Sequence, residues 1–282
     1  MTQYLPGDPE YRAFVGPFEQ YDVMGATQFA LLYSLGIRQQ HRLLDIGCGS
    51  LRAGRLFITY LEPGNYTGIE PNTWLIDDAI KQQVGQDLVS IKSPTFIDTD
   101  SFDVAGLGRF DFVVAQSIAS HAGPELVLKL LDAVKAALLP TGLAAVTFVH
   151  ADPSDRLVVH VEPGDTQWPQ WLYPVCFSYR RPVVESFVAE AGLVGAPIPW
   201  FHPRQTWWLL AHFESVLPGN KFLNQLRGVT LAEGFEDSWM TEREALTKRQ
   251  EAKPAVDPLR VAYAHYVSHI TGFQPRFGGM PE

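Results

Sequence analysis

The segment 41–54 most constrains the fold of this chain. Its first half holds an apolar run from Leu43 to Ile46 that predicts a short buried strand, and apolar residues at helical spacing follow the segment's glycines. Between strand and helix lie Gly47 and Gly49. Because only glycine lets the main chain approach a ligand so closely, the segment predicts a backbone-lined cradle for an anion or a polar group.

The residues around the glycines favour one class of ligand. A nicotinamide-type fingerprint requires a third glycine where this chain has Arg52, and Asp45 before the turn suits a ligand ammonium group better than a pyrophosphate. The pattern Leu-Asp-Ile-Gly-Cys-Gly resembles the first motif of the class I S-adenosylmethionine-dependent methyltransferases. This resemblance implies that the turn cradles the methionine part of S-adenosylmethionine and that Glu70, ending the next strand, holds the ribose hydroxyls. The alternative is that the glycine turn serves only the packing of the strand and the helix and binds no cofactor.

Composition narrows the function classes. The chain has 282 residues, and its apolar fraction of 46% is typical of a globular protein. Its net charge of -9 disfavours a nucleic-acid partner. Two cysteines predict neither a disulfide framework nor a thiolate metal site, and we expect no metal. The N-terminus lacks a basic region followed by an apolar run, and no stretch is long enough to span a bilayer, so we expect a cytoplasmic protein without membrane contacts.

Strand and helix patterns alternate along the chain, which predicts an α/β fold with a doubly wound parallel sheet. We expect strands at 43–46, 66–70, 95–102, 110–116, 143–150, 193–199 and 202–212, and helices near 50–61, from 71 and 124, and over 180–191. The resemblance implies a Rossmann-like seven-stranded sheet whose last strand is antiparallel. The predicted divisions are a helical N-terminal cap (1–40), a methyltransferase core (41–213) with a substrate-side insertion (151–178), and a helical C-terminal extension (214–282) that covers the site or forms a homodimer.

The cofactor-binding residues that the resemblance implies follow the first four strands. They are Asp45, Gly47, Cys48, Gly49, Ser50 and Arg52 in the glycine turn, Glu70 and Pro71 after the second strand, Asp100, Ser101 and Phe102 after the third, and Gln116 and Ser117 after the fourth. Four other stretches resemble the motifs of a bacterial methyltransferase subfamily associated with small-molecule or sugar modification. They are residues 21–29, 50–54, 116–121 and 202–207.

Histidines at the strand ends are the candidate general bases. His121 follows the fourth strand, at the sheet edge where the transferable methyl group would point, and histidine titrates near neutrality. His150, ending the fifth strand, is the second candidate, and capping or carbonyl contacts are the alternative roles for His121. The predicted substrate contacts are Tyr21, Trp168, Trp171, Tyr173 and His202, with Gln28 as a further lid contact.

These features favour S-adenosylmethionine-dependent methyl transfer to a small molecule, at an oxygen of an aromatic or sugar-like metabolite. The aromatic insertion motivates the substrate class, and His121 motivates oxygen, because a hydroxyl acceptor must lose a proton. Methyl transfer to nitrogen or to a carboxylate is an alternative, since neither a neutral amine nor a carboxylate needs a base. Two further alternatives are a module that binds S-adenosylmethionine without turnover and a nicotinamide-dependent oxidoreductase.

Overall fold

The computed structural model describes residues 4–151, 154–156, 158–163, 165 and 168–227. Its α-helices are α1 (Tyr11–Phe14), α2 (Tyr21–Ser34), α3 (Gly54–Tyr60), α4 (Thr73–Ala79), α5 (Gln86–Lys92), α6 (Pro124–Ala137), α7 (Arg181–Glu190) and α8 (Asn220–Arg227). The structure also has two short 3-10 helices, η1 (Phe18–Gln20) and η3 (Glu214–Val216), and one π-helical turn, η2 (Ile80–Val84). Its strands are β1 (Leu43–Ile46), β2 (Tyr66–Ile69), β3 (Thr95–Ile97), β4 (Phe110–Ala115), β5 (Leu138–Phe148), β6 (Val158–Val161), β7 (Cys176–Tyr179), β8 (Val194–Ile198) and β9 (Thr206–Ala211).

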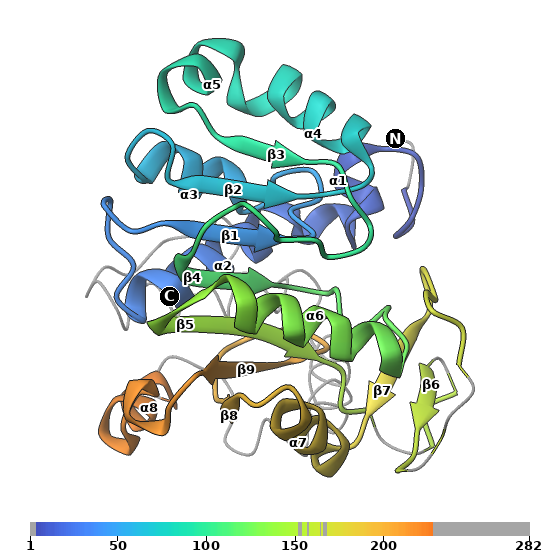
Figure 1. Cartoon of the computed structure of the whole chain (residues 1–282). Helices are drawn as coiled ribbons and strands as arrows, with labels where there is room; N and C mark the ends of the chain where they lie inside the picture. The colour runs from blue at the N-terminus through green and yellow to red at the C-terminus, as the bar shows by residue number, and fades with distance from the viewer. Residues whose placement is uncertain (1–3, 152–153, 157, 164, 166–167, 228–282) are drawn as a thin grey trace, which may run out of the picture.

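Seven strands form one sheet in the order β3-β2-β1-β4-β5-β9-β8 (Figure 1). The pairs from β3 to β5 are parallel, and β9 is antiparallel to both β5 and β8. This arrangement confirms the predicted doubly wound sheet with an antiparallel last strand. The strand order reverses between β1 and β4, and the crevice outside the carboxyl ends at such a point is where open α/β sheets bind ligands.

Apolar side chains on both faces of the sheet explain why its central strands are buried. In β1 and β4, successive residues point to opposite faces, so that Leu43 and Phe112 pack with α2, α3 and α4 while Leu44 and Val113 pack with α6 and α7. Leu43, Leu44 and Val113 are all fully buried. Burial of each such side chain contributes roughly 1.5–3 kcal/mol. The two helical layers therefore hold the strand ends in fixed positions.

Several predicted boundaries were wrong, and the last strand, β9, begins at Thr206 where the sequence predicted residue 202. β3 ends at Ile97, because the chain then leaves the sheet in a loop where Phe102 has a left-handed φ of 57°. β5 begins at Leu138, directly after α6, and its register against β4 shifts between Phe110, which pairs with Leu138, and Phe112, which pairs with Leu143. α3 begins at Gly54, because the preceding residues form turns.

The insertion contains structure that its proline-rich sequence did not indicate. β6 and β7 pair in parallel as a separate two-stranded sheet (Figure 1). Its register joins Val158 to Cys176 and Val161 to Tyr179, and Val161, Phe177 and Tyr179 are buried against the core. The strands β6 and β7 of the insertion are therefore packed against the core.

The ends of the chain are described in part. α2 packs on the core, and the Tyr21 hydroxyl donates to the Ser50 carbonyl over 2.6 Å. Residues 228–282 of the predicted helical C-terminal extension, and with them the predicted dimer contact, lie outside the described residues, so the division into cap, core and extension stays a prediction. Within the described ranges, no helix is long and apolar enough to cross a membrane.

Candidate active site

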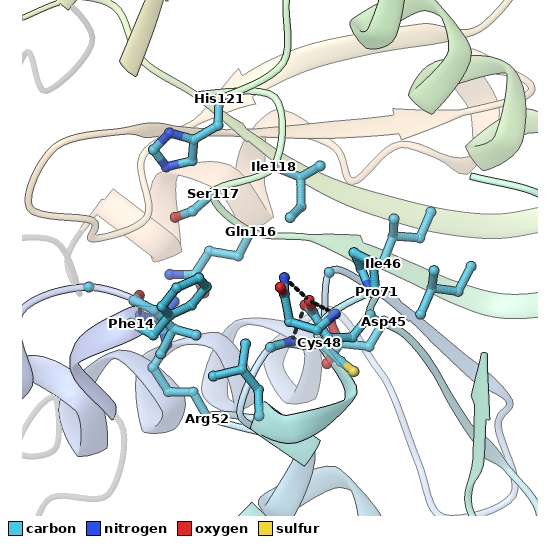
Figure 2. Close-up of a pocket in the computed structure, with 18 of the residues that line it drawn as sticks. Phe14, Asp45, Ile46, Cys48, Arg52, Pro71, Gln116, Ser117, Ile118 and His121 are labelled. Carbon is cyan, nitrogen blue, oxygen red and sulfur yellow. Dashed lines mark hydrogen bonds between the residues drawn. The ribbon is translucent and has the colours of Figure 1, made fainter. Parts of the chain in front are cut away.

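A cavity of about 470 Å³ opens at the carboxyl ends of the parallel strands. This volume lies within the range of small-molecule sites, roughly 300–1,000 Å³. Its walls come from the α1 end, the glycine turn after β1, the ends of β2 and β4, the loop after β3, and the insertion. In Figure 2, Gln116, Ser117 and His121 follow one another along one wall, and Asp45, Cys48 and Arg52 lie across from them.

Neither Gly47 nor Gly49 has space for a side chain. Gly47 and Gly49 have φ values of 72° and 52°, and a Cβ on Gly47 would lie 2.0 Å from the Ile118 side chain. The Glu70 carboxylate fixes the turn, because its Oε2 accepts the Gly49 N–H at 3.0 Å and its Oε1 accepts the Asn72 N–H at 2.9 Å. The main chain therefore lines the cavity here, as the sequence predicted from the glycines.

Asp45 lies at the base of this turn with its carboxyl group buried. The Tyr66 hydroxyl donates to its Oδ2 at 2.8 Å. Burial raises the pKa of Asp45 to about 7, while the Tyr66 hydrogen bond and the Arg52 charge lower it by less. A buried carboxyl group that titrates near neutrality is stabilised in its charged form by a cationic ligand group.

The end of β4 presents unsatisfied polar groups to the cavity. Gln116 is 6% exposed, and among the described residues neither its amide nitrogen nor its amide oxygen has a hydrogen-bond partner. Ser117 has a left-handed φ of 64°, and two contacts hold it there: its N–H donates to Thr147 Oγ1 at 2.7 Å, and Gln205 Nε2 donates to its Oγ at 2.8 Å. Buried amides normally find partners, so Gln116 indicates a ligand contact.

His121 is held in one orientation by backbone carbonyls of the insertion. Its Nδ1 lies 3.1 Å from the Leu172 oxygen and 2.9 Å from the Val175 oxygen. Since carbonyl oxygens only accept, Nδ1 carries the proton and Nε2 has a free lone pair. Burial lowers the pKa of His121, so the imidazole is neutral at physiological pH. This arrangement suits a general base.

The cavity brings together most of the predicted site residues. Those that line it are Asp45, Gly47, Cys48, Gly49, Arg52, Glu70, Pro71, Asp100, Phe102, Gln116, Ser117, His121, Trp171, Tyr173 and the lid residue Gln28. Six predicted residues are not part of the lining, namely Tyr21, Ser50, Ser101, His150, Trp168 and His202.

The two other histidines that were predicted as site residues, His150 and His202, make structural contacts. His150 has both ring nitrogens engaged: Nδ1 contacts the Tyr179 carbonyl at 2.6 Å, and Trp208 Nε1 donates to Nε2 at 3.0 Å, so it is not free to act as a base. His202 is buried, and its Nδ1 accepts the backbone N–H groups of Arg204 and Gln205 at 3.1 and 3.0 Å. It therefore shapes the turn before β9 and does not reach the substrate side.

The other four also have local explanations. Tyr21 and Ser50 bond to each other below the glycine turn, and Trp168 packs its ring on Phe177 at a centroid distance of 6.1 Å. Ser101 is exposed and its hydroxyl pairs with Thr99. Ser50 and Ser101 are each one residue away from a lining residue, a difference that the sequence pattern alone does not distinguish.

Sequence reasoning missed several lining residues. Phe14 and Val15 reach the cavity from the N-terminal segment, Asn72 follows Glu70, and Arg204 comes from the turn before β9. Arg204 lies inside the 202–207 stretch that the subfamily resemblance singled out, which is the signal that could have identified it. Phe14 had no such signal, because an aromatic residue in a short helix usually packs.

Comparison with known proteins agrees with this geometry. Residues 44–144 match the family model described as a methyltransferase domain, which spans β1 to β5 and therefore the glycine turn, Glu70 and His121. The chain contains a methyltransferase domain. It is accordingly an enzyme of the methyltransferase class. No curated protein sequence matches the chain.

Solved structures share the fold of this methyltransferase domain. An S-adenosylmethionine-dependent methyltransferase from Clostridium acetobutylicum superposes with a TM-score of 0.51 at 11% identity, covering 73% of this chain and 93% of its own. Magnesium protoporphyrin IX methyltransferase from Synechocystis, solved with bound SAH, gives 0.50 at 12% identity over 69% and 87%. DhpI, in complex with SAM and HEP, gives 0.50 at 15% identity over 71% and 90%. At these identities the likeness shows the fold alone.

Proposed function

We propose that the methyltransferase domain binds S-adenosylmethionine in the cavity and methylates an oxygen of a small aromatic or sugar-like acceptor. The observation that carries this proposal is the neutral, oriented His121 in the same cavity as the glycine turn. The acceptor is a hydroxyl, because the free Nε2 of His121 has a use only where the acceptor loses a proton.

The residues present suit the cofactor. The glycine turn and the Arg52 and Asp45 side chains would hold the methionine part, with the buried carboxylate of Asp45 facing the ammonium group. Glu70 would hold the ribose hydroxyls, because a carboxylate has lone pairs beyond those that accept the Gly49 and Asn72 N–H groups. When bound, S-adenosylmethionine supplies an electrophilic methyl group on a sulfonium centre.

The acceptor side consists of the β4 end and the insertion. Phe102, Trp171 and Tyr173 line it, and their rings offer an apolar surface to the body of an acceptor. His121 Nε2 would take the proton of the acceptor hydroxyl as its oxygen gains the methyl group and S-adenosylhomocysteine is released, and the Leu172 and Val175 carbonyls would stabilise the resulting imidazolium through Nδ1. The enclosing walls exclude water and align the reactants.

The test combines binding with turnover in one pair of proteins, wild type and His121→Ala. Calorimetry should show that both bind S-adenosylmethionine and S-adenosylhomocysteine alike and that neither binds NADH. Transfer of labelled methyl groups to a panel of phenols and sugars should then be slower in the variant by about 10²–10⁴-fold, the contribution of a general base. Full activity of His121→Ala would instead favour a nitrogen or carboxylate acceptor, and binding without any transfer would favour a non-catalytic module.

A further inference from the structure

Arg204 brings a charge to the cavity that the methyl-transfer scheme does not use. It lies in the turn before β9, is half-buried, and lines the cavity with His121 and Tyr173. Its backbone N–H donates to His202, which fixes the turn. Within the part of the chain that the structure describes, its guanidinium group has no hydrogen-bond or ion-pair partner.

The charge of Arg204 acts on three groups of the acceptor side, and also on Arg52 and the buried His202. Besides burial, this positive charge lowers the pKa of His121, and it opposes the burial that raises the pKa of Tyr173 and of Cys176. No carboxylate acts on these three groups among the described residues.

The carboxylates that line the cavity are Asp45, Glu70 and Asp100, and none of them is an electrostatic neighbour of His121, Tyr173 or Cys176. Asp45 titrates under the influence of Tyr66, Arg52 and Glu70, so its counter-cation is Arg52. Glu70 accepts hydrogen bonds from the Gly49 and Asn72 N–H groups. The cofactor half therefore has both signs of charge, while the half around His121 has an uncompensated cation.

A second, independent observation points to a polar ligand on the same side. Gln116 is buried beside the cavity with both amide atoms unpartnered among the described residues, and it follows β4 directly before the His121 loop. Burial of a polar or charged group without a hydrogen-bond partner is unfavourable, and a hydrogen bond to a complementary ligand offsets that cost. Guanidinium presents parallel donors that match an oxyanion in a bidentate contact.

We propose that the methyl acceptor carries an oxyanion, a carboxylate or a phosphate, that Arg204 binds while the acceptor hydroxyl faces His121. The substrate class is then a small hydroxy acid or phosphorylated alcohol with an apolar or aromatic body. The bound oxyanion also offsets the unfavourable field of Arg204 on the imidazolium that forms at His121. This inference rests on the proposed function for the reaction, but anion binding by Arg204 can be measured without turnover.

The experiment titrates wild type, Arg204→Gln and Arg204→Lys with benzoate, phenyl phosphate and the neutral analogue benzamide, with and without saturating S-adenosylhomocysteine. Arg181→Gln is the matched control, because it removes one positive charge from an exposed ion pair with Glu185. We expect wild type to bind at least one anion about tenfold or more tighter than benzamide, and Arg204→Gln to lose that preference. Arg204→Lys should recover part of the affinity, and Arg181→Gln should match wild type. The two anions distinguish a carboxylate from a phosphate site.

Three outcomes would overturn the inference. One is equal affinity of wild type for anions and benzamide, or no anion binding. Another is unchanged anion affinity in Arg204→Gln. The third is a large loss of S-adenosylhomocysteine affinity in Arg204→Gln, which would assign Arg204 to the cofactor carboxylate. Failure of wild type to bind S-adenosylhomocysteine, with Arg204-dependent anion binding intact, would overturn only the proposed function.

Discussion

Asp45 shows how burial tunes a single residue for its ligand. Its carboxyl group is fully desolvated and receives one hydrogen bond, from Tyr66, so the charged form is disfavoured and the pKa rises to about 7. An ammonium group bound beside it would favour the charged form. In the free protein the pKa of Asp45 is therefore close to physiological pH. A cationic ligand bound beside it would lower that pKa, and Asp45 would then lose its proton.

This predicts that S-adenosylhomocysteine affinity falls as the pH is lowered through about 7. Protonated Asp45 cannot pair with the ammonium group, so calorimetry should show a loss on the order of tenfold between pH 7.5 and 5.5. Asp45→Asn should bind weakly with little dependence on pH. The control Asp77→Asn changes an exposed acid outside the cavity and should behave as wild type. Affinity of wild type that does not vary over this range would contradict the role of Asp45.

Residues 170–177 of the insertion are joined by hydrogen bonds to the turn between β4 and α6, around His121. Backbone hydrogen bonds join them at three places: Gly123 N–H to Gln170, Leu172 N–H to His121, and Phe177 N–H to Ser120, at 2.7, 2.9 and 2.7 Å. Gly123 permits this approach, because a Cβ there would lie 2.4 Å from the Pro169 carbonyl oxygen. The insertion therefore supplies the carbonyls that orient the base.

We predict that Gly123→Ala separates these two elements. The added methyl group displaces the insertion backbone, so His121 loses its fixed tautomer and kcat should fall by about tenfold or more, while S-adenosylhomocysteine affinity changes little. Steady-state kinetics and calorimetry on the same preparation test this. Gly219→Ala is the control, since a Cβ there has no neighbour within 4 Å. Equal losses in kcat and cofactor affinity would indicate a general disturbance of the fold.

The cavity is assembled from segments that are distant along the chain. The Tyr173 hydroxyl donates to the Phe14 carbonyl, and the Phe14 ring lies 5.4 Å from that of Tyr173 and 5.3 Å from that of Trp74. The N-terminal segment, the sheet edge and the insertion thus meet over one space. A ligand that fills it contacts all three and stabilises the folded chain as a whole.

Thermal unfolding should report this stabilisation. At about 100 times its Kd, a ligand specific for the folded state adds about 2.7 kcal/mol. In a protein of this size that raises Tm by roughly 5–10 °C. Scanning calorimetry with S-adenosylhomocysteine should show the increase, and NADH at the same concentration should show none. An equal shift with both ligands would argue against a site selective for the adenosyl cofactor.

Some features of the site could be predicted because they depend on neighbours in sequence. Gly47, Gly49 and Glu70 follow from a turn that only glycine permits and from the regular spacing of strand, helix and strand. His121 was predicted for the same reason, since it follows a clearly apolar strand, and it lines the cavity. His150 met the same criterion, yet Trp208 and Tyr179 occupy its ring nitrogens, and those partners are 58 and 29 residues away in sequence.

The amino-acid sequence by itself determined the α/β class, the central strands and the ligand-binding edge, because apolar periodicity and glycine turns act over a few residues. Only the tertiary structure decided which side chains face the cavity and in what state. Packing of the insertion sets the tautomer of His121, burial sets the ionisation of Asp45, and the turn before β9 brings Arg204 beside them. These properties depend on desolvation and on contacts between distant segments, which exist only once the layers have packed.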